Sequence, residues 1–266
     1  MSSPRILIYD IETAPLLGAV WRLWKTNVPV NQIKDDWYIM SYSAKWLGDP
    51  QILYNDLREL DPSEYETGDF GLSYELHALL SEADIVVAHN GRKFDNRRVN
   101  ARFIKHGLPP PHNYKTVDTL IESRKQFDFP SHSLEYLTEH LLPEEHHKRR
   151  SAKFPGFDLW AECMKGNREA WEEMEEYNRQ DVVALEALYL KLRPWIIGHP
   201  NVGNLGEELP DRPACPKCGS TSLQKRGTYR TQVQQYQRYS CKDCGGWSRG
   251  RYTVADKAKR TNLLVN

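Results

Sequence analysis

Two carboxylates stand at the end of the first apolar run of the sequence. Residues 5–13 read RILIYDIET, a pattern typical of a buried strand, and Asp10 and Glu12 lie near its end. Alternate side chains of a strand point to the same face, which places both carboxylates together. Carboxylate oxygens are the ligands that hard cations such as Mg²⁺ and Mn²⁺ prefer. The pair could therefore belong to a metal site, although by itself it also fits the solvated end of an ordinary strand.

A third carboxylate, Asp95, follows the short apolar run 85–88 (IVVA). Asp95, Val99 and Phe103 are spaced four residues apart, so the carboxylate shares one stripe of an expected helix with two core residues. An acidic residue in the first turn of a helix is also favoured by the helix dipole. Asp95 thus fits either an inward-facing site residue or an ordinary helix-terminal aspartate.

The long helix expected over residues 169–192 carries two polar side chains on its apolar stripe, Tyr177 and Asp181. The other members of the stripe are Trp171, Met174, Leu185, Leu188 and Leu192. A buried aspartate is costly unless it is ion-paired, hydrogen-bonded or bound to a metal. Asp181 is therefore either a structural partner of a neighbouring group or a metal ligand, and Tyr177 by itself fits a core aromatic.

Together these residues form three motifs, which are Asp10-x-Glu12, Asn90-x3-Phe94-Asp95 and Tyr177-x3-Asp181. Their order and spacing resemble the signature of the DEDD, or DnaQ-like, superfamily of 3′→5′ exonucleases, in the subclass (DEDDy) with tyrosine in the third motif. Glu176 stands where the other subclass has histidine, and residues 117–120 (VDTL) and 133–137 (SLEYL) resemble intermediate segments of the family. The resemblance covers about residues 5–193 and implies an RNase H-like α/β fold, a mixed sheet flanked by helices.

The resemblance also implies an activity, metal-dependent 3′→5′ exonuclease action on nucleic acid, on DNA more than on RNA. It assigns Asp10 as the carboxylate that bridges two Mg²⁺ or Mn²⁺ ions, with Glu12, Asp95 and Asp181 completing their ligand shells. Phosphodiester hydrolysis at neutral pH needs a nucleophilic water and neutralisation of charge at phosphorus, and two ions ~3.5–4 Å apart supply both. A phenol with a pKa of ~10 is a poor base at neutral pH, so Tyr177 is expected to orient that water.

Two other functions remain open at this point. The same metal site could cut internally, as a structure-specific endonuclease, or the fold could serve a non-catalytic nucleic-acid recruitment factor. Four mutually repelling acids argue against the second, since a platform has no need of them.

Four cysteines form two C-x2-C pairs, Cys215 with Cys218 and Cys241 with Cys244, separated by 22 residues. A glycine follows the second cysteine of each pair and allows a tight turn. The pattern resembles a zinc ribbon that holds one structural Zn²⁺ by four thiolates, with disulfides as the alternative. About 40 residues cannot build an adequate core, so we expect the metal to be required for folding. The fifth cysteine, Cys163, is expected to be buried in a helix.

The charge is divided unevenly along the chain, although the net charge is zero. Residues 1–210 hold 24 Lys and Arg against 33 Asp and Glu, whereas residues 211–266 hold 12 against 3. Cations interleaved with aromatic rings favour binding of single-stranded nucleic acid by the ribbon, but the rings could instead form its core, and the ribbon could dock a protein. The candidate nucleic-acid contacts are Thr13, Asn90, Arg92, Lys93, Lys225, Arg226, Arg230, Tyr236, Arg238 and Trp247.

The composition and the apolar runs outline the elements that must position these groups. The expected strands are 5–13, 38–46, 51–54, 85–88 and 115–118, and the expected helices are 72–83, 94–106, 133–142 and 169–192, with a loop over 56–70. The expected regions are a nuclease domain over 1–198, a linker over 199–213, the zinc ribbon over 214–254 and a basic tail over 255–266. Since no apolar run reaches the ~18–20 residues of a membrane span and no secretion signal is evident, we expect a cytoplasmic protein.

Overall fold

The computed structural model describes residues 4–149, 151–206 and 209–265. The chain divides into two compact units, one formed by Arg5–Tyr189 and the other by the rest of the described chain, mainly from Leu190 onward. The expected boundaries at residues 198, 213 and 254 stay predictions. Within the described ranges, no helix combines the length and the apolar character that crossing a bilayer requires.

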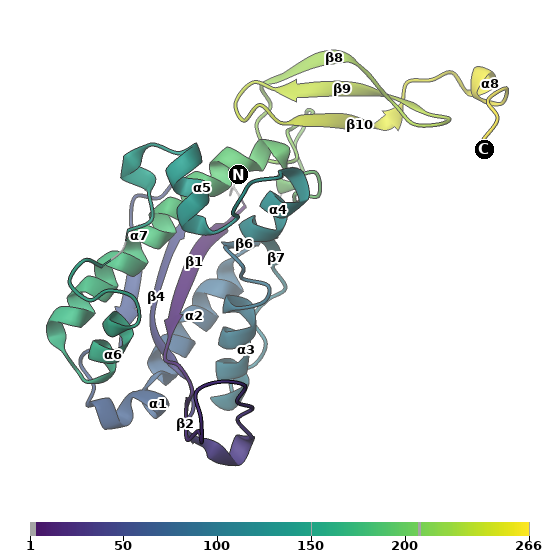
Figure 1. Cartoon of the computed structure of the whole chain (residues 1–266). Coiled ribbons are helices and arrows are strands. Elements are labelled where there is room, and N and C mark those ends of the chain that lie inside the picture. Colours follow the sequence, from purple (N-terminus) through teal and green to yellow (C-terminus); the bar gives the residue numbers. More distant parts are fainter. Residues whose placement is uncertain (1–3, 150, 207–208, 266) are drawn as a thin grey trace. The chain divides into compact units, whose positions relative to one another are not determined.

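A mixed five-stranded sheet with the order β5-β4-β1-β6-β7 forms the centre of the first unit (Figure 1). The strands are β1 (Ile6–Thr13), β4 (Ile39–Trp46), β5 (Leu53–Asp56), β6 (Ile85–Ala88) and β7 (Lys115–Asp118). β1 pairs antiparallel with β4 and parallel with β6, and β5 and β7 complete the two edges. The mixed α/β architecture expected from the sequence is thus confirmed.

The central position of β1 follows from its sequence. Leu7, Ile8 and Tyr9 are fully buried, as expected for an apolar strand that is covered on both faces. Each such side chain contributes on the order of 1.5–3 kcal/mol on leaving water. The regular pairing with β4 shifts between Glu12 and Thr13, so the strand is locally irregular directly after its two carboxylates, although Thr13 still pairs with Ile39.

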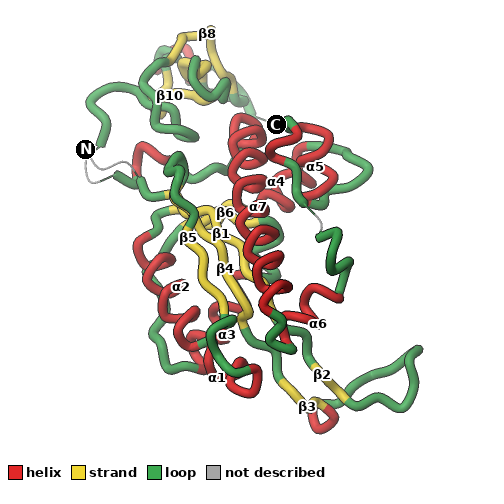
Figure 2. The backbone as a smooth tube through the Cα atoms, turned by 90° about the vertical axis from the view of Figure 1, so that its left-hand side faces the viewer, coloured by secondary structure: helices red, strands yellow, loops and turns green. Residues whose placement is uncertain are grey.

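Helices cover the two faces of the sheet (Figure 2). α2 and α3 pack against the face that carries Leu7, Tyr9 and Ile11, whereas α7 lies on the face that carries Asp10. The helices of this unit are α1 (Tyr65–Gly68), α2 (Phe70–Glu82), α3 (Asp95–Lys105), α4 (Thr119–Gln126), α5 (Leu134–Leu141), α6 (Asp158–Met164) and α7 (Arg168–Leu192). The expected helix stripe holds, since Asp95, Val99 and Phe103 are all buried.

Several elements differ from the sequence-based expectation. The strand expected at 51–54 lies at 53–56, and the stretch 56–70 is not simply a loop, because Pro62–Glu64 and α1 are helical there. The Asp61 side chain accepts the Ser63 N–H and so caps this turn. α4 was not expected because its capping residue, Asp118, also ends β7. The short strands β2 (Leu17–Gly18) and β3 (Ile33–Asp35) were likewise not expected, whereas α6 is the helix expected around Cys163.

The second unit contains a three-stranded antiparallel sheet in the order β10-β9-β8. Its elements are β8 (Leu223–Arg230), β9 (Gln235–Cys241), β10 (Trp247–Thr253) and the short helix α8 (Lys257–Arg260). Gly219 and Gly245 follow the two cysteine pairs with φ of 77° and 75°, a conformation that favours glycine. This small β-domain agrees with the expected ribbon.

Candidate active site

Three carboxylates from the centre of the sheet and from α7 meet in one cluster. One oxygen of each of Asp10, Glu12 and Asp181 lies within 4.8 Å of the others. Asp181 is only 2% exposed, and its Oδ1 is buried without a hydrogen-bond partner among the described residues. An unpartnered buried acceptor is costly. The donor set therefore fits a hard divalent cation, which prefers carboxylate oxygens.

Two neighbouring side chains orient the strand carboxylates. The Asn178 side chain donates from Nδ2 to Asp10 Oδ2 at 2.9 Å, and Trp160 donates its indole N–H to Glu12 Oε2 at 3.1 Å. Ser41 donates its hydroxyl to Asn178 Oδ1 at 3.3 Å, which fixes the amide with its NH₂ toward Asp10. Each carboxylate is thus held by a donor to one oxygen, as ligands of metal sites commonly are.

Asp95 lies behind the strand rather than within the three-membered cluster. Its Oδ1 accepts the backbone N–H of Ile11 at 3.3 Å, between the two strand carboxylates. The turn before it is held by Asp118, which accepts the backbone N–H groups of Asn90 and Arg92 at 3.1 Å each. Asn90 has a φ of 69°, a left-handed conformation that asparagine tolerates. Asp118 and this turn therefore set the start of α3 and the position of Asp95.

A cation of the chain itself enters the cluster. Lys148 Nζ lies 2.5 Å from Asp181 Oδ2 and 4.6 Å from the centroid of the Tyr177 ring. The Tyr177 ring packs edge-on against Trp160, with the centroids 5.8 Å apart. Lys148 is not among the site residues that the sequence pattern indicated. It stands in a segment without periodicity, so no pattern indicated its inward position.

Burial and mutual repulsion raise the proton affinity of the cluster. Burial and the charges of Asp95, Glu12 and Asp181 raise the pKa of Asp10 well above its usual range. Burial and Asp181 raise the pKa of Glu12 to about 8, and burial raises the pKa of Asp95 to about 7 despite two backbone N–H donors. Burial and the Asp181 charge also raise the pKa of Tyr177 above its usual value, so its phenol stays protonated. A bound divalent cation would relieve this repulsion.

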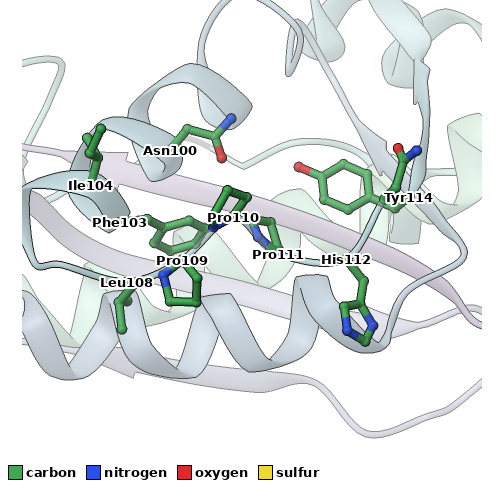
Figure 3. Close-up of a pocket in the computed structure, with 10 residues that line it drawn as sticks. Asn100, Phe103, Ile104, Leu108, Pro109, Pro110, Pro111, His112 and Tyr114 are labelled. Carbon is green, nitrogen blue, oxygen red and sulfur yellow. The ribbon is translucent and has the colours of Figure 1, made fainter.

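Two shallow grooves flank the cluster on the side of Lys148 and Tyr177. One, of about 260 Å³, is lined by Tyr177, Glu176 and Lys153, and the other, of about 650 Å³, by Lys148, Glu135 and Tyr136 among others. A separate cavity of about 550 Å³ lies between α3 and the proline-rich segment 108–114 (Figure 3). Its lining is mostly apolar and contains neither the clustered carboxylates nor Lys148 and Tyr177, so it is not part of this site.

The four paired cysteines of the second unit also converge. Cys215 Sγ lies 3.6 Å from Cys244 Sγ, and Cys218 Sγ lies 3.7 Å from Cys241 Sγ. A tetrahedral Zn²⁺ with Zn–S bonds of ~2.3 Å requires sulfur separations of ~3.8 Å, so the donor set fits zinc. All four sulfurs lie together as free thiols, which favours zinc over the disulfide alternative, and Cys163 is buried in α6 as expected.

Although burial raises the pKa of the Cys241 thiol, the N–H groups of Cys244 and Asp243 lower it to about 7. Such donors favour the thiolate form that metal binding requires.

The candidate nucleic-acid contacts of the first unit differ in their exposure and in their hydrogen-bond partners. Thr13 Oγ1 accepts a hydrogen bond from Arg98 Nη1 at 2.6 Å, and the Arg98 guanidinium lies over the rings of Trp37 and Phe94. Asn90 serves the turn described above, whereas Arg92 and Lys93 are exposed. Arg98, which sequence reasoning left among the general surface cations, is the one that reaches the end of β1.

In the ribbon, several arginines lie over aromatic rings and form cation–π contacts with them. Arg238 lies over Trp247 at 4.9 Å, and Arg249 lies over Tyr236 at 4.0 Å. The remaining candidates on β8, which are Lys225, Arg226 and Arg230, are exposed. The exposed row on β8 therefore keeps its charge available to a polyanion, while four rings of the ribbon, Tyr229, Tyr236, Trp247 and Tyr252, already have cation partners.

With this fold and site in view, the comparisons with known proteins define the family. Residues 56–193, more than half of the chain, match the model of the RNase H superfamily, and the chain belongs to this superfamily. Among solved structures it is similar to the family B DNA polymerase from the hyperthermophilic archaeon Pyrobaculum calidifontis, with 14% identity and a TM-score of 0.43. The similarity covers 73% of this chain but only 26% of the polymerase chain. No curated protein matches.

Proposed function

We propose that this protein is a metal-dependent nuclease that removes nucleotides from the 3′ ends of nucleic acid, of DNA more than of RNA. The observation that carries the proposal is the convergence of Asp10, Glu12 and Asp181 at the end of the central strand of an RNase H superfamily fold. The 3′→5′ direction and the DEDDy subclass rest on the motif resemblance, in which Tyr177 stands one helical turn before Asp181.

Asp10, Glu12 and Asp181, with Asp95 beside them, would hold two Mg²⁺ or Mn²⁺ ions. When bound, these ions supply an activated water and charge neutralisation at the phosphate. The residues of the chain have separate roles in this proposal. Asn178 and Trp160 hold the strand carboxylates in place, as described above. Tyr177 keeps its phenolic proton and orients the water by hydrogen bonding rather than by deprotonating it.

Lys148 has a place in the same proposal. Although burial opposes it, the neighbouring charges of Asp181, Tyr177 and Asp10 raise the pKa of Lys148, so it stays a cation at neutral pH. Its ammonium lies beside the cluster and lines one of the two grooves. A phosphate that enters along this groove would meet Lys148 next to the carboxylates, where its negative charge most needs a counter-charge.

The second unit would support the first through its charge. One structural Zn²⁺ held by the four cysteines would fold the ribbon, and the exposed cations of β8 would bind the nucleic-acid backbone. A basic module linked to an acidic catalytic unit raises the local concentration of a polyanionic substrate. A protein partner of the ribbon is the competing assignment.

The test incubates purified protein with 5′-labelled single- and double-stranded DNA and RNA, with Mn²⁺ or with EDTA. A metal-dependent ladder that shortens from the 3′ end supports the proposal. A single internal product would instead indicate an endonuclease, and no cleavage of any substrate would indicate a recruitment factor.

The matched variants are Asp10→Asn and Glu172→Gln. Asp10→Asn should reduce cleavage by at least about 10³-fold, because it removes a charged ligand and its electrostatic contribution. Glu172 lies on the exposed side of α7, and its variant should cleave like the wild type. If Asp10→Asn cleaved at the wild-type rate, the assignment of Asp10 as a catalytic metal ligand would be wrong.

A further inference from the structure

A projecting arm follows the carboxylate strand directly. We define the arm as residues 15–35, which leave the end of β1 and return to the sheet before β4. β2 and β3 pair at its base, with Leu17 opposite Asp35 and Gly18 opposite Ile33. The 14 residues between these strands extend the arm beyond the helices, as Figure 2 shows. The arm thus begins within a few residues of Asp10 and Glu12.

The arm has a defined local structure. A Cβ added to Gly18 would lie 3.3 Å from Val28 Cγ1, so the loop packs closely on its own base. Near the tip, Thr26 donates its hydroxyl to the Arg22 carbonyl at 2.5 Å, and Lys25 has a left-handed φ of 51°. These contacts form a tight turn at the end of the arm.

This turn leaves two tryptophans in solvent. Trp21 is 94% exposed and Trp24 is 82% exposed, and Leu23 between them is 85% exposed. Large aromatic side chains are normally buried to a high degree, so a pair of solvated indoles indicates a binding surface for a ligand or a partner.

The charge of the arm identifies the partner. The arm contains three cations, Arg22, Lys25 and Lys34, and one carboxylate, Asp35, which lies at its base, within a part of the chain that is otherwise acidic. Rings that alternate with cations suit a single-stranded nucleic acid, whose bases stack on the rings and whose phosphates meet the cations.

We propose that the arm binds a single-stranded segment of the substrate, several nucleotides before the strand end, with bases stacked on Trp21 and Trp24. The proposal rests on the proposed function in one respect, since it takes the strand end to lie at Asp10 and Glu12. Trp21 stands eight residues beyond Thr13, so the backbone spans at most ~29 Å between them. At ~3.4 Å per stacked nucleotide this distance corresponds to about eight nucleotides. The arm should therefore contact long strands and not short ones.

The test measures binding of the full, zinc-loaded chain to fluorescein-labelled oligothymidylates of 20 and 4 nucleotides without added Mg²⁺ or Mn²⁺ and without chelator, so that the ribbon stays folded and cleavage is not supported. The double variant Trp21→Ala/Trp24→Ala should bind the 20-mer at least about 25-fold more weakly, since loss of one stacked base costs at least about 5-fold. Its affinity for the 4-mer should equal that of the wild type. Trp21→Phe/Trp24→Phe should restore most of the 20-mer affinity, because phenylalanine still stacks.

Tyr74→Ala is the matched control, since Tyr74 is a 60% exposed ring on α2, outside the arm. It should bind both oligonucleotides like the wild type. Unchanged 20-mer affinity in the double alanine variant overturns the proposal, and so does an equal loss for both lengths. A double alanine variant that loses self-association but keeps its affinity for nucleic acid would show that the arm is a protein interface. That outcome also overturns the proposal. Because binding is read without cleavage, an enzyme that cleaves nothing would refute the proposed nuclease without affecting this result.

Discussion

Lys148 Nζ and Asp181 Oδ2 lie 2.5 Å apart, which joins a loop cation to the most buried carboxylate of the three-membered cluster. The Lys148 side chain is 22% exposed and that of Asp181 is 3% exposed, so the pair is largely removed from water. The loop that carries Lys148 therefore completes the electrostatic balance of the site when no other cation is present.

Lys148→Met should destabilise the metal-free protein by about 1–3 kcal/mol, because it leaves the buried charge of Asp181 without a partner. The loss should shrink when Mn²⁺ is present, since a bound ion takes over the neutralisation. Urea denaturation in EDTA and in Mn²⁺ measures both values. Lys153→Met, which removes an exposed ion pair with Glu169, should change stability by less than about 1 kcal/mol. Equal effects of the two variants would contradict the role of Lys148.

The stability of the metal-free protein should fall as the pH rises from 6.5 to 8. Burial and Asp181 raise the pKa of Glu12 to about 8, and burial raises that of Asp95 to about 7. The folded protein therefore holds protons that the unfolded chain has released, which lowers stability with increasing pH. Burial lowers the pKa of His89 to about 4, an effect of opposite sign that acts only below pH 6.5.

Melting temperatures in EDTA across this range test the prediction. The decrease should be on the order of 1–2 kcal/mol, Asp10→Asn should make it smaller, and Mn²⁺ should stabilise most at pH 8. Stability that rises with pH in EDTA would show that the carboxylates do not repel one another as described.

Trp160→Phe should weaken Mn²⁺ binding and cleavage about 10-fold or more while leaving the fold intact. Phenylalanine keeps a ring against Tyr177 but removes the N–H that orients Glu12. Loss of such a supporting donor commonly lowers metal affinity or activity 10- to 100-fold. Calorimetric titration with Mn²⁺ measures the affinity. Trp195→Phe, outside the catalytic unit, is the control and should bind Mn²⁺ normally. Wild-type affinity in Trp160→Phe would reduce Trp160 to a packing residue.

Cys241→Ser should remove the zinc and with it the fold of the ribbon, because four thiolates are needed to close the site. Metal analysis should show zinc in the wild type and little in the variant. The salt dependence of nucleic-acid binding should also become shallower, by about 0.7–0.9 in slope for each phosphate contact that is lost. A variant without zinc but with an unchanged salt slope would show that the ribbon does not contact phosphate.

Much of the site could be predicted because its residues belong to regular elements. The period of a strand places Asp10 and Glu12 on one face, and the period of a helix places Asp181 inward among apolar neighbours. The same helical period would also have found Asn178, which lies three residues before Asp181 and four after Met174 on the buried face. The spacing of the four cysteines likewise indicated their convergence, since each pair requires only a local turn.

The arrangement of loops could not be predicted in this way. Lys148, Trp160 and the turn held by Asp118 reach the site from segments that have no repeating pattern or are short, and the exposed tryptophans of the arm look in sequence like core residues. By itself, the sequence determined most of the long strands and helices and which carboxylates face inward, because local periodicity and burial act over a few neighbouring residues. Only the tertiary structure decided which cation, donors and rings surround those carboxylates, because such contacts depend on chain segments up to 168 residues apart.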